Sequence, residues 1–335
     1  MPIPLRPPTA ASTSGVPTRV ATRAPVAPAL VLSAATLLAL GALATPARAL
    51  SPPDPSGNIP WDEDPERPEA QADFEGVAAV EAAFDNARRA EERQLDLPDG
   101  ALGTLELPDQ DAWDAMDGGA RALALANAER TARAGVPYPG GAPLGLPLEA
   151  VETHLDALAQ AYADYMLAEN YWGHDAPADG AAPFAGSDPF SRIDAHPALG
   201  EGAGADGGDC HDFLGQAENL AVFASSGGDD IRLPVERAIY GFVYDDAGSA
   251  WGHRHLMLLQ DRPLRRDSGG FVDDAGPAGS EGYLGVGSAG ANDGSYRVFD
   301  DAEGFPVQRN VVVLIIDPVP GDGCGYELEE APPGG

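Results

Sequence analysis

The segment 234–259, PVERAIYGFVYDDAGSAWGHRHLMLL, brings together residue types that can do acid–base or metal-binding chemistry. The imidazole of His253 follows Asp245 by a few residues, and an apolar run comes directly after it. Imidazoles bind metals and carry protons near neutral pH, and neighbouring groups decide which ring nitrogen is free to do so. A histidine beside an apolar run is, however, more often a hydrogen-bonded structural residue than a ligand, so both interpretations stay open at this point.

Two further titratable side chains lie earlier in the chain. Glu218 is the one acid within the mostly apolar run at residues 213–223. Because burial of an unpaired carboxylate is costly, Glu218 needs a partner if this run is buried. The alternative is a short surface helix with its carboxylate in solvent. His174 stands just after a long apolar-periodic segment, in the sequence Trp172-Gly173-His174.

Hydrophobic periodicity predicts the elements that must position these residues. Helices are expected at about residues 73–95, 120–134, 148–171 and from Pro234 to Phe242. The second ends at Gly135, a residue that favours a helix C-terminus, and the fourth starts at a proline, which a first helical turn tolerates. Residues 282–286 and 310–316 read as strands, and the second has the composition of a fully buried one. Helices that come first and strands that come late predict an α+β domain.

The chain outside this domain divides into segments of different character. Residues 50–71 are rich in proline and acids, which predicts a disordered linker. Residues 72–116 hold the first helix and a second linker, and the apolar face of that helix is expected to pack on the domain that follows. We place the globular domain at residues 117–318 and a flexible C-terminal tail at residues 319–335.

The first 49 residues have the order of a secretory signal peptide. Basic residues precede an apolar run at residues 29–44, and the small-x-small sequence Ala47-Arg48-Ala49 follows. This run is shorter than the roughly 20 residues that span a bilayer, which disfavours an N-terminal membrane anchor. We therefore expect cleavage after Ala49 and a secreted protein, extracellular or periplasmic, without a transmembrane segment.

The charge of the chain excludes several partners. Acidic residues outnumber basic ones by 53 to 20, which gives a formal net charge of −33. Four of the basic residues lie in the leader, so its removal takes this charge to −37. Such a protein repels nucleic acids and anionic lipid headgroups. We expect a monomer that binds no nucleic acid.

The two cysteines, Cys210 and Cys324, are candidates for a disulfide in an oxidising compartment. A bond that closes so long a loop would stabilise the fold by roughly 4–5 kcal/mol in the chain-entropy model. The chain has no CxxC motif, so redox catalysis is not expected.

Several short motifs occur in the order known from one protein family. In the first half they are Asn127 and Arg130 before Gly135, Leu144, Tyr162-Ala163, Trp172-Gly173-His174 and Asp179-Gly180. In the second half they are Phe190-Ser191-Arg192, Ala217-Glu218-Asn219-Leu220, Gly252-His253-Arg254 with Met257-Leu258, and Leu284-Gly285-Val286-Gly287. By this ordered set the chain resembles the CAP superfamily of cysteine-rich secretory proteins, antigen 5 and pathogenesis-related proteins, and its bacterial secreted branch in particular, over residues 117–318.

The resemblance implies an α-β-α sandwich with a central, mostly antiparallel sheet, to which this chain adds an N-terminal helical extension. It also implies a cleft that holds two imidazoles and two acids: His174, Glu218, Asp245 and His253. The family's second acid stands in an Ala-x-x-x-Trp-x-x-Glu pattern, where this chain has Ala238, Phe242 and Asp245. Aspartate is one methylene shorter than glutamate, so it reaches less far into the cleft.

Two imidazoles with carboxylates can hold a divalent metal such as zinc, with His174 and His253 as the ligands. Without metal, the same four groups can form a hydrogen-bonded network. The resemblance implies a secreted, non-catalytic binding module that holds a metal or a small apolar, lipid-like ligand.

Two alternatives to this function stay open. One is a metal-dependent hydrolase or peptidase in which Glu218 is the general base. The other is a structural or surface-interaction protein. The chain contains no HExxH sequence and no recognisable serine or cysteine nucleophile motif, which favours binding over catalysis.

Overall fold

The structure is a computed structural model, and it describes part of the chain. The described residues are 51–60, 74–138, 144–176, 182–200, 213–225, 230–259, 264–265, 271–272, 282–298, 305–318 and 324–329. The chain divides into two compact units at Ala44, and every described residue belongs to the second unit. The expected signal peptide at residues 1–49 and the expected disulfide partner Cys210 lie outside the described residues.

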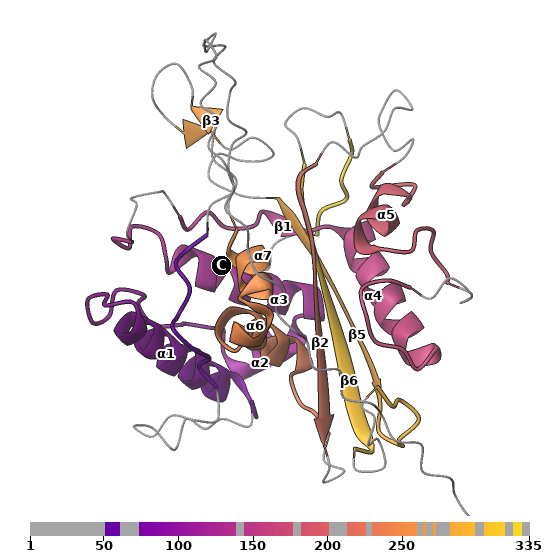
Figure 1. The fold of residues 1–335 in the computed structure, drawn as a ribbon, viewed down its shortest axis with the longest axis horizontal. Coiled ribbons are helices and arrows are strands. Elements are labelled where there is room, and N and C mark those ends of the chain that lie inside the picture. The colour runs from indigo at the N-terminus through magenta and orange to yellow at the C-terminus, as the bar shows by residue number, and fades with distance from the viewer. Residues whose placement is uncertain are drawn as a thin grey trace, which may run out of the picture. The chain divides into compact units, whose positions relative to one another are not determined.

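A four-stranded sheet forms the centre of the described unit (Figure 1). In spatial order its strands are β1 (Ala150–Val151), β5 (Tyr283–Ala291), β6 (Val307–Pro318) and β2 (Phe213–Ser225). The β5–β6 and β6–β2 pairs are antiparallel and the short β1–β5 pair is parallel, so the sheet is mostly antiparallel as predicted. A separate two-stranded sheet pairs β3 (Leu264–Arg265) with β4 (Phe271–Val272).

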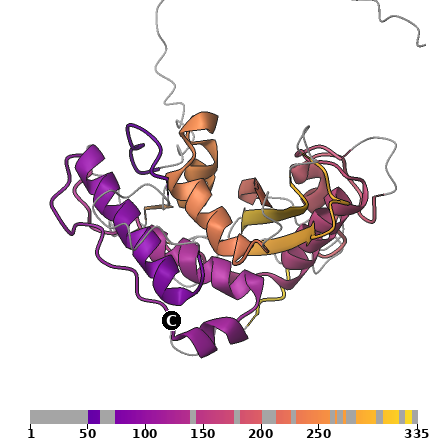
Figure 2. The same ribbon diagram turned by 90° about the horizontal axis from the view of Figure 1, so that it is seen from below.

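Helices cover both faces of the four-stranded sheet (Figure 2). One face carries α4 (Thr153–Ala168) and α5 (Pro189–Asp194). The other side carries α2 (Gln110–Ala115), α3 (Gly118–Thr131), α6 (Pro234–Tyr244) and α7 (Gly252–Leu258), with α1 (Val77–Gln94) packed against α6. This arrangement confirms the predicted α+β class and the α-β-α sandwich.

The central strand β6 divides its side chains between two hydrophobic cores. Successive residues of a strand point to opposite faces. Val311, Val313 and Ile315 therefore enter the core under α3 and α6, and the residues between them enter the core under α4. Burial on both faces explains why the sequence NVVVLII is apolar without alternation, as the prediction of a fully buried strand required.

Strand β2 contains the run around Glu218 and is longer than the sequence suggested. It pairs with β6 over thirteen residues, from Phe213 to Ser225. Leu220 faces the α4 core, whereas Ala217 belongs to the core under α6, so this strand is also covered on both faces. The alternative of a short surface helix is wrong.

The N-terminal extension packs on α6. Phe84 of α1 makes edge-to-face contacts with Tyr240 and Tyr244, at ring-centroid distances of 5.3 and 5.9 Å. Residues 51–60, expected to belong to a disordered linker, contact the same helix. The Ile59 N–H donates to the Tyr244 carbonyl at 2.8 Å, and the Tyr240 hydroxyl donates to the Ile59 carbonyl at 2.8 Å. The prediction of a disordered linker is wrong for residues 51–60, because these hydrogen bonds attach the segment to α6.

Part of the expected flexible tail also packs on the domain. Residues 324–329 run beside β1 and the start of α4. The Thr153 N–H donates to the Glu327 carbonyl at 2.8 Å, and the Glu329 N–H donates to the Val151 carbonyl at 3.0 Å. Cys324 is disulfide-bonded. Since Cys210 is not described, its pairing with Cys324 stays a prediction.

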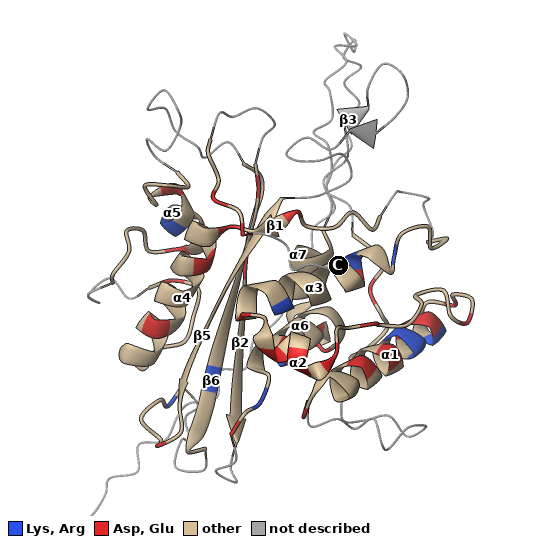
Figure 3. Cartoon of the chain, turned by 180° about the vertical axis from the view of Figure 1, so that it is seen from behind, with Lys and Arg blue, Asp and Glu red and all other residues tan. Residues whose placement is uncertain are grey.

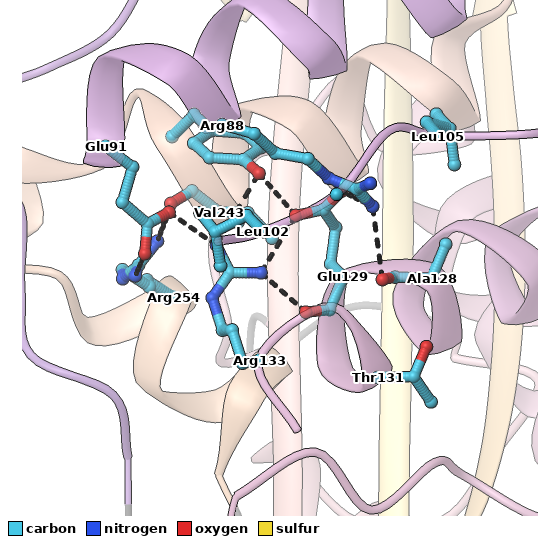
Figure 4. Close-up of polar contacts among 12 residues, drawn as sticks. Arg88, Glu91, Leu102, Leu105, Ala128, Glu129, Thr131, Arg133, Val243 and Arg254 are labelled. Carbon is cyan, nitrogen blue, oxygen red and sulfur yellow. Dashed lines mark hydrogen bonds and ion pairs between the residues drawn. The ribbon is translucent and has the colours of Figure 1, made fainter. Parts of the chain in front are cut away.

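A chain of buried charges joins α1 to the core helices (Figure 4). Glu129 of α3 accepts from Arg88 of α1 at 2.8 Å and from Arg133 at 2.9 Å. Glu91 of α1 accepts from the same Arg133 and, at 2.7 Å, from Arg254 of α7. Each of these five side chains is at most 2% exposed. Arg133 therefore bridges the two glutamates and makes one continuous network.

The protonation of the two glutamates follows from their partners. Burial alone raises the pKa of a carboxyl group, but Arg133 and Arg254 lower the pKa of Glu91 below its usual value. Arg88 and Arg133 do the same for Glu129, whose carboxylate also accepts from the Tyr244 hydroxyl. Both glutamates are thus ionised at neutral pH, and each depends on its arginines.

Helix α4 lies so close to β5 that two glycines are required there. A Cβ added to Gly285 would lie 2.4 Å from backbone atoms of Leu155 and Asp156, and one added to Gly287 would lie 2.3 Å from the backbone of Ala159. The glycines of the Leu284-Gly285-Val286-Gly287 motif therefore set the distance between helix and sheet.

Replacement of Gly287 by alanine should force α4 away from β5. We expect Gly287→Ala to lower the free energy of unfolding by about 1–3 kcal/mol, as overpacking does. Urea unfolding followed by circular dichroism would measure this. The matched control is Gly241→Ala in α6, where an added Cβ meets no atom within 4 Å and alanine favours the helix. An equal loss in both variants would contradict the close-approach argument.

Neutralisation of Glu129 should leave Arg88 and Arg133 buried without adequate charge compensation. We expect Glu129→Gln to lower the free energy of unfolding at pH 7 by about 3–5 kcal/mol. The control Glu75→Gln removes an ion pair with Arg232 in which both side chains are more than 60% exposed, and should cost less than about 1 kcal/mol.

Wild type and Glu129→Gln should differ in how their free energy of unfolding depends on pH. A carboxyl whose pKa is lowered by folding stabilises the fold fully above its unfolded-state pKa of about 4.3, and this stability is lost as pH falls through the lower folded-state value. The difference in stability between wild type and Glu129→Gln should therefore shrink below about pH 4. A difference that stays constant down to pH 2 would contradict this account.

Candidate functional site

The structure brings His174 and Glu218 together. His174 lies in the loop after α4, and its Nδ1 is 2.8 Å from Oε1 of Glu218 on β2. The imidazole is 49% exposed, whereas the Glu218 side chain is 1% exposed. A carboxylate oxygen accepts a hydrogen bond from Nδ1–H, so this contact leaves Nε2 as the ring's free acceptor. The pair therefore presents an oriented imidazole to solvent.

Arg192 of α5 holds both members of this pair. Its Nη2 donates to Oε2 of Glu218 at 2.5 Å, and its Nη1 donates to the His174 carbonyl at 2.9 Å. Its guanidinium lies over the Tyr162 ring, 3.6 Å from the ring centroid. The Phe190-Ser191-Arg192 motif marked this residue in the sequence, but gave it no role. The missing information was its contact with Glu218, which is 26 positions away in the chain.

His253 has an acid partner of its own, and it is not the expected one. Its Nδ1 lies 2.7 Å from Oδ1 of Asp246 and 3.2 Å from the Ser249 hydroxyl. Asp246 is buried, and its second oxygen accepts from the Arg254 N–H at 3.1 Å. The Asp245 side chain is exposed.

The position of the end of α6 explains this correction. The family pattern counts helical positions up to Asp245, but the helix ends at Tyr244, and Asp245 is its C-cap with φ −121°. The turn that follows directs Asp246, one residue later, toward α7. Burial alone raises the pKa of Asp246, but hydrogen bonds from His253, Ser249 and the Arg254 N–H lower it below its usual value. The acid beside His253 is therefore ionised.

The two histidines lie on opposite faces of one strand. Glu218 and Asn219 are consecutive residues of β2, so their side chains point to opposite sides. Glu218 contacts His174 on the α5 side, and the Asn219 amide donates to the His253 carbonyl on the α7 side at 3.0 Å. β2 is the last strand of its sheet, so residues His174 and His253 lie on opposite faces of the sheet beside its last strand.

These donors do not fit a metal ion. Zinc in proteins usually takes three or four protein ligands. Among the described residues no three histidine, cysteine or acidic side chains are arranged to hold a metal. Both oxygens of Glu218 are occupied by His174 and Arg192, and Asp246 is bonded to Nδ1 of His253, so neither carboxylate supplies a third ligand. The Nδ1 contacts themselves leave Nε2 of each imidazole open. The expected role of His174 and His253 as metal ligands therefore finds no support in this geometry.

The remaining described histidines lie elsewhere. His255 pairs with Asp54 at 2.7 Å. His196 lies beside His154, with ring centroids 5.7 Å apart. Burial, and after it the nearby His154, lowers the pKa of His196. His211 lies outside the described residues.

A large cavity also lies away from the two imidazoles. Its volume is about 690 Å³, and it opens where the segment before α1, helix α2, the segment before α6 and the ends of β5 and β6 meet. Gln110, Arg232, Ser288 and Arg309 are among its lining residues, and none of the four expected cleft residues lines it.

Comparison with protein-family models, curated proteins and solved structures found no match. Acidic residues, coloured red in Figure 3, are spread over several helices of the described unit. Among the residues that the structure describes, no helix is both long and apolar enough to cross a membrane.

The two neighbouring aspartates make a sharp test of the site. Asp246→Asn should weaken the hydrogen bond that fixes Nδ1–H on His253, because the acceptor loses its charge. We expect the imidazole to gain Nε2–H tautomer, which ¹⁵N chemical shifts of the ring report. Loss of the charged acceptor for the Arg254 N–H should also lower the free energy of unfolding by about 1–3 kcal/mol.

The matched control for this prediction is Asp245→Asn, one residue earlier and exposed. It should change the His253 ring signals less than Asp246→Asn does. The reverse order of effects would restore Asp245 to the role that the sequence gave it.

Proposed function

We propose that this chain is a secreted member of the CAP superfamily and that it acts as a non-catalytic extracellular binding module. The binding site is the edge of the sheet between His174 and His253. The predicted signal peptide, the ordered motifs and an α-β-α sandwich of the kind that this family implies all support the proposal.

One observation carries the proposed binding role. Each imidazole is oriented through Nδ1 by a buried carboxylate, Glu218 or Asp246, so that each ring can offer Nε2 to a ligand. The side-chain entropy of these partly exposed rings is therefore lost on folding, before a ligand arrives. Groups fixed before the ligand arrives favour binding, since less freedom is lost when the complex forms.

Aromatic side chains near His174 suit a small apolar ligand with a polar end. Trp172 and Phe184 are partly buried against the α4 core, and Phe190 of α5 is 49% exposed. An apolar chain could lie on these rings while a polar group accepts or donates at Nε2 of His174. This combination of apolar lining with a few oriented polar groups is typical of ligand sites.

The arrangement gives less support to catalysis. In the described part of the chain, Nε2 of neither His174 nor His253 is hydrogen-bonded to a serine, threonine or cysteine side chain. Ser249 contacts Nδ1 of His253, the nitrogen already held by Asp246, so it is not placed as an activated nucleophile. A hydrolase would also need Glu218 as a base, but this carboxylate is bonded to both Arg192 and His174.

A fluorescent long-chain fatty acid is a suitable probe of this proposal. The mature protein should bind it saturably at one site, and His174→Ala/His253→Ala should weaken binding at least about tenfold, which corresponds to about 1.4 kcal/mol. Fluorescence titration measures both. Phe190→Ala should weaken binding as well, since it removes apolar contact area without change to the imidazoles.

Turnover is measured with the same proteins. Release of p-nitrophenol from p-nitrophenyl acetate should not differ between wild type and the double variant. A wild-type rate that the double variant loses would overturn the non-catalytic assignment and favour the hydrolase. Equal fatty-acid affinity in wild type and double variant would remove the small apolar ligand from the proposal.

A further inference from the structure

Among the described residues, no strand pairs with the outer edge of β2. β2 stands last in the sheet order β1-β5-β6-β2 and pairs with β6 from Phe213↔Pro318 to Ser225↔Val307 (Figure 1). An antiparallel strand directs its N–H and C=O groups to its two neighbours alternately. Among the described residues, no backbone or side-chain group outside β6 bonds to the main chain of β2. Half of its backbone donors and acceptors are therefore directed away from the sheet.

This edge has few of the features that usually protect an edge strand. Natural edges are shortened, bulged, or carry lysine, proline or an inward charge. β2 is thirteen residues long and contains no proline or basic residue. Its one acid, Glu218, points inward, where it is paired with Arg192 and hydrogen-bonded to His174. Its one irregularity in register lies between Phe213 and Gly215, so residues 216–225 form a regular template.

The two oriented imidazoles lie on either side of this template. Glu218 brings His174 to one face of β2, and Asn219 contacts the backbone of His253 on the other. A strand added to this edge would project its side chains alternately toward the two faces. Every second side chain of the added strand would then lie on the side of the sheet that carries His174, and the others on the side that carries His253.

We infer that the outer edge of β2 binds an extended segment of a basic partner protein, which adds to the sheet as a fifth strand. This inference rests on the proposed function and names its partner class. Main-chain hydrogen bonds supply affinity in this mode, and alternate side chains supply selectivity.

Charge decides between a foreign segment and a second copy of this chain. The chain carries a net charge of −33, so two copies repel one another, whereas a basic segment is attracted. Acids also lie close to the edge. Asp194 accepts from Gln216 of β2 at 2.8 Å, and Asp175, the neighbour of His174 in the chain, is exposed. A segment with arginine or lysine at alternate positions would place positive charge along these acids.

The probe is an acetylated and amidated ten-residue peptide of alternating valine and arginine. Its length matches residues 216–225. Two control peptides separate the contributions: the same peptide N-methylated at every residue, which keeps the charges but cannot donate main-chain hydrogen bonds, and a valine–glutamate peptide of the same length. We expect both controls to bind the mature protein at least tenfold more weakly in fluorescence anisotropy.

Amide hydrogen exchange by NMR locates the binding. In the free protein, alternate amides of residues 216–225 should exchange fast, because every second N–H faces outward. The valine–arginine peptide should slow these fast amides at least tenfold and leave the β6-paired amides unchanged. Protection of all ten amides in the free protein would mean that the chain covers its own edge, and would overturn the inference.

Proline variants test the edge without reliance on one substitution. Of Ala221→Pro and Val222→Pro, one removes an N–H that faces β6 and the other an N–H that faces outward. The variant that keeps the wild-type melting temperature is the outward one, and it should bind the peptide at least tenfold more weakly. Unchanged peptide binding in that folded variant would overturn the inference.

The outcomes for the two proposals differ. If the fatty acid binds through the two histidines but the peptide protects no amide of β2, the proposed function stands and the strand-addition inference fails. Concentration-dependent protection of the same alternate amides in the absence of peptide would assign the edge to a second copy of the chain, and would overturn the basic partner. A protein that binds neither probe would refute both proposals.

Discussion

The structure depends on the buried guanidinium of Arg133, because two buried carboxylates share it as a partner. Arg133 lies between Glu129 and Glu91, and its guanidinium joins two acid–base pairs that are each fully buried. Without Arg133 the two carboxylates would lose the partner that they share, and burial would favour their neutral form. Because Glu91 belongs to α1 and Glu129 to α3, this contact also makes the N-terminal helix part of the core. The N-terminal helix, which the sequence predicted to lie outside the domain, is thus attached to the domain by buried ion pairs.

The same network reaches the candidate site. Arg254 donates to Glu91 and to the Val243 carbonyl, and His253 precedes it directly in the chain. The backbone N–H of Arg254 also donates to Asp246, the acid that orients His253. Burial of one arginine therefore fixes both the start of α7 and the position of the imidazole. On the other face of β2, Arg192 donates to Glu218 and to the His174 carbonyl, and so fixes the position of the His174 imidazole.

The sequence predicted the fold well for elements whose apolar residues follow one clear pattern. The helices around Leu155 and Ile239 follow from apolar periodicity, and the strand around Val313 follows from an unbroken apolar run. The motif glycine Gly287 lies where α4 approaches β5 closely. The sequence-based prediction failed where a residue distant in the chain determines whether a side chain is buried. β2 reads as ambiguous because Glu218 interrupts an apolar run, and only the contact with Arg192 makes its burial possible. Asp246 could not be distinguished from Asp245, since a single residue at the end of α6 decides which carboxylate turns inward.

Burial of charged side chains leaves the surface strongly acidic. Five arginines, Arg88, Arg130, Arg133, Arg192 and Arg254, are at most 3% exposed, and eight acidic residues are buried as well. These numbers are small beside the excess of 53 acidic over 20 basic residues in the whole chain, so the solvent-facing charge stays negative. Such a surface gathers a dense atmosphere of small cations. A basic partner that approaches would release part of this atmosphere, so the entropy of freed counterions would add to whatever contacts the partner makes.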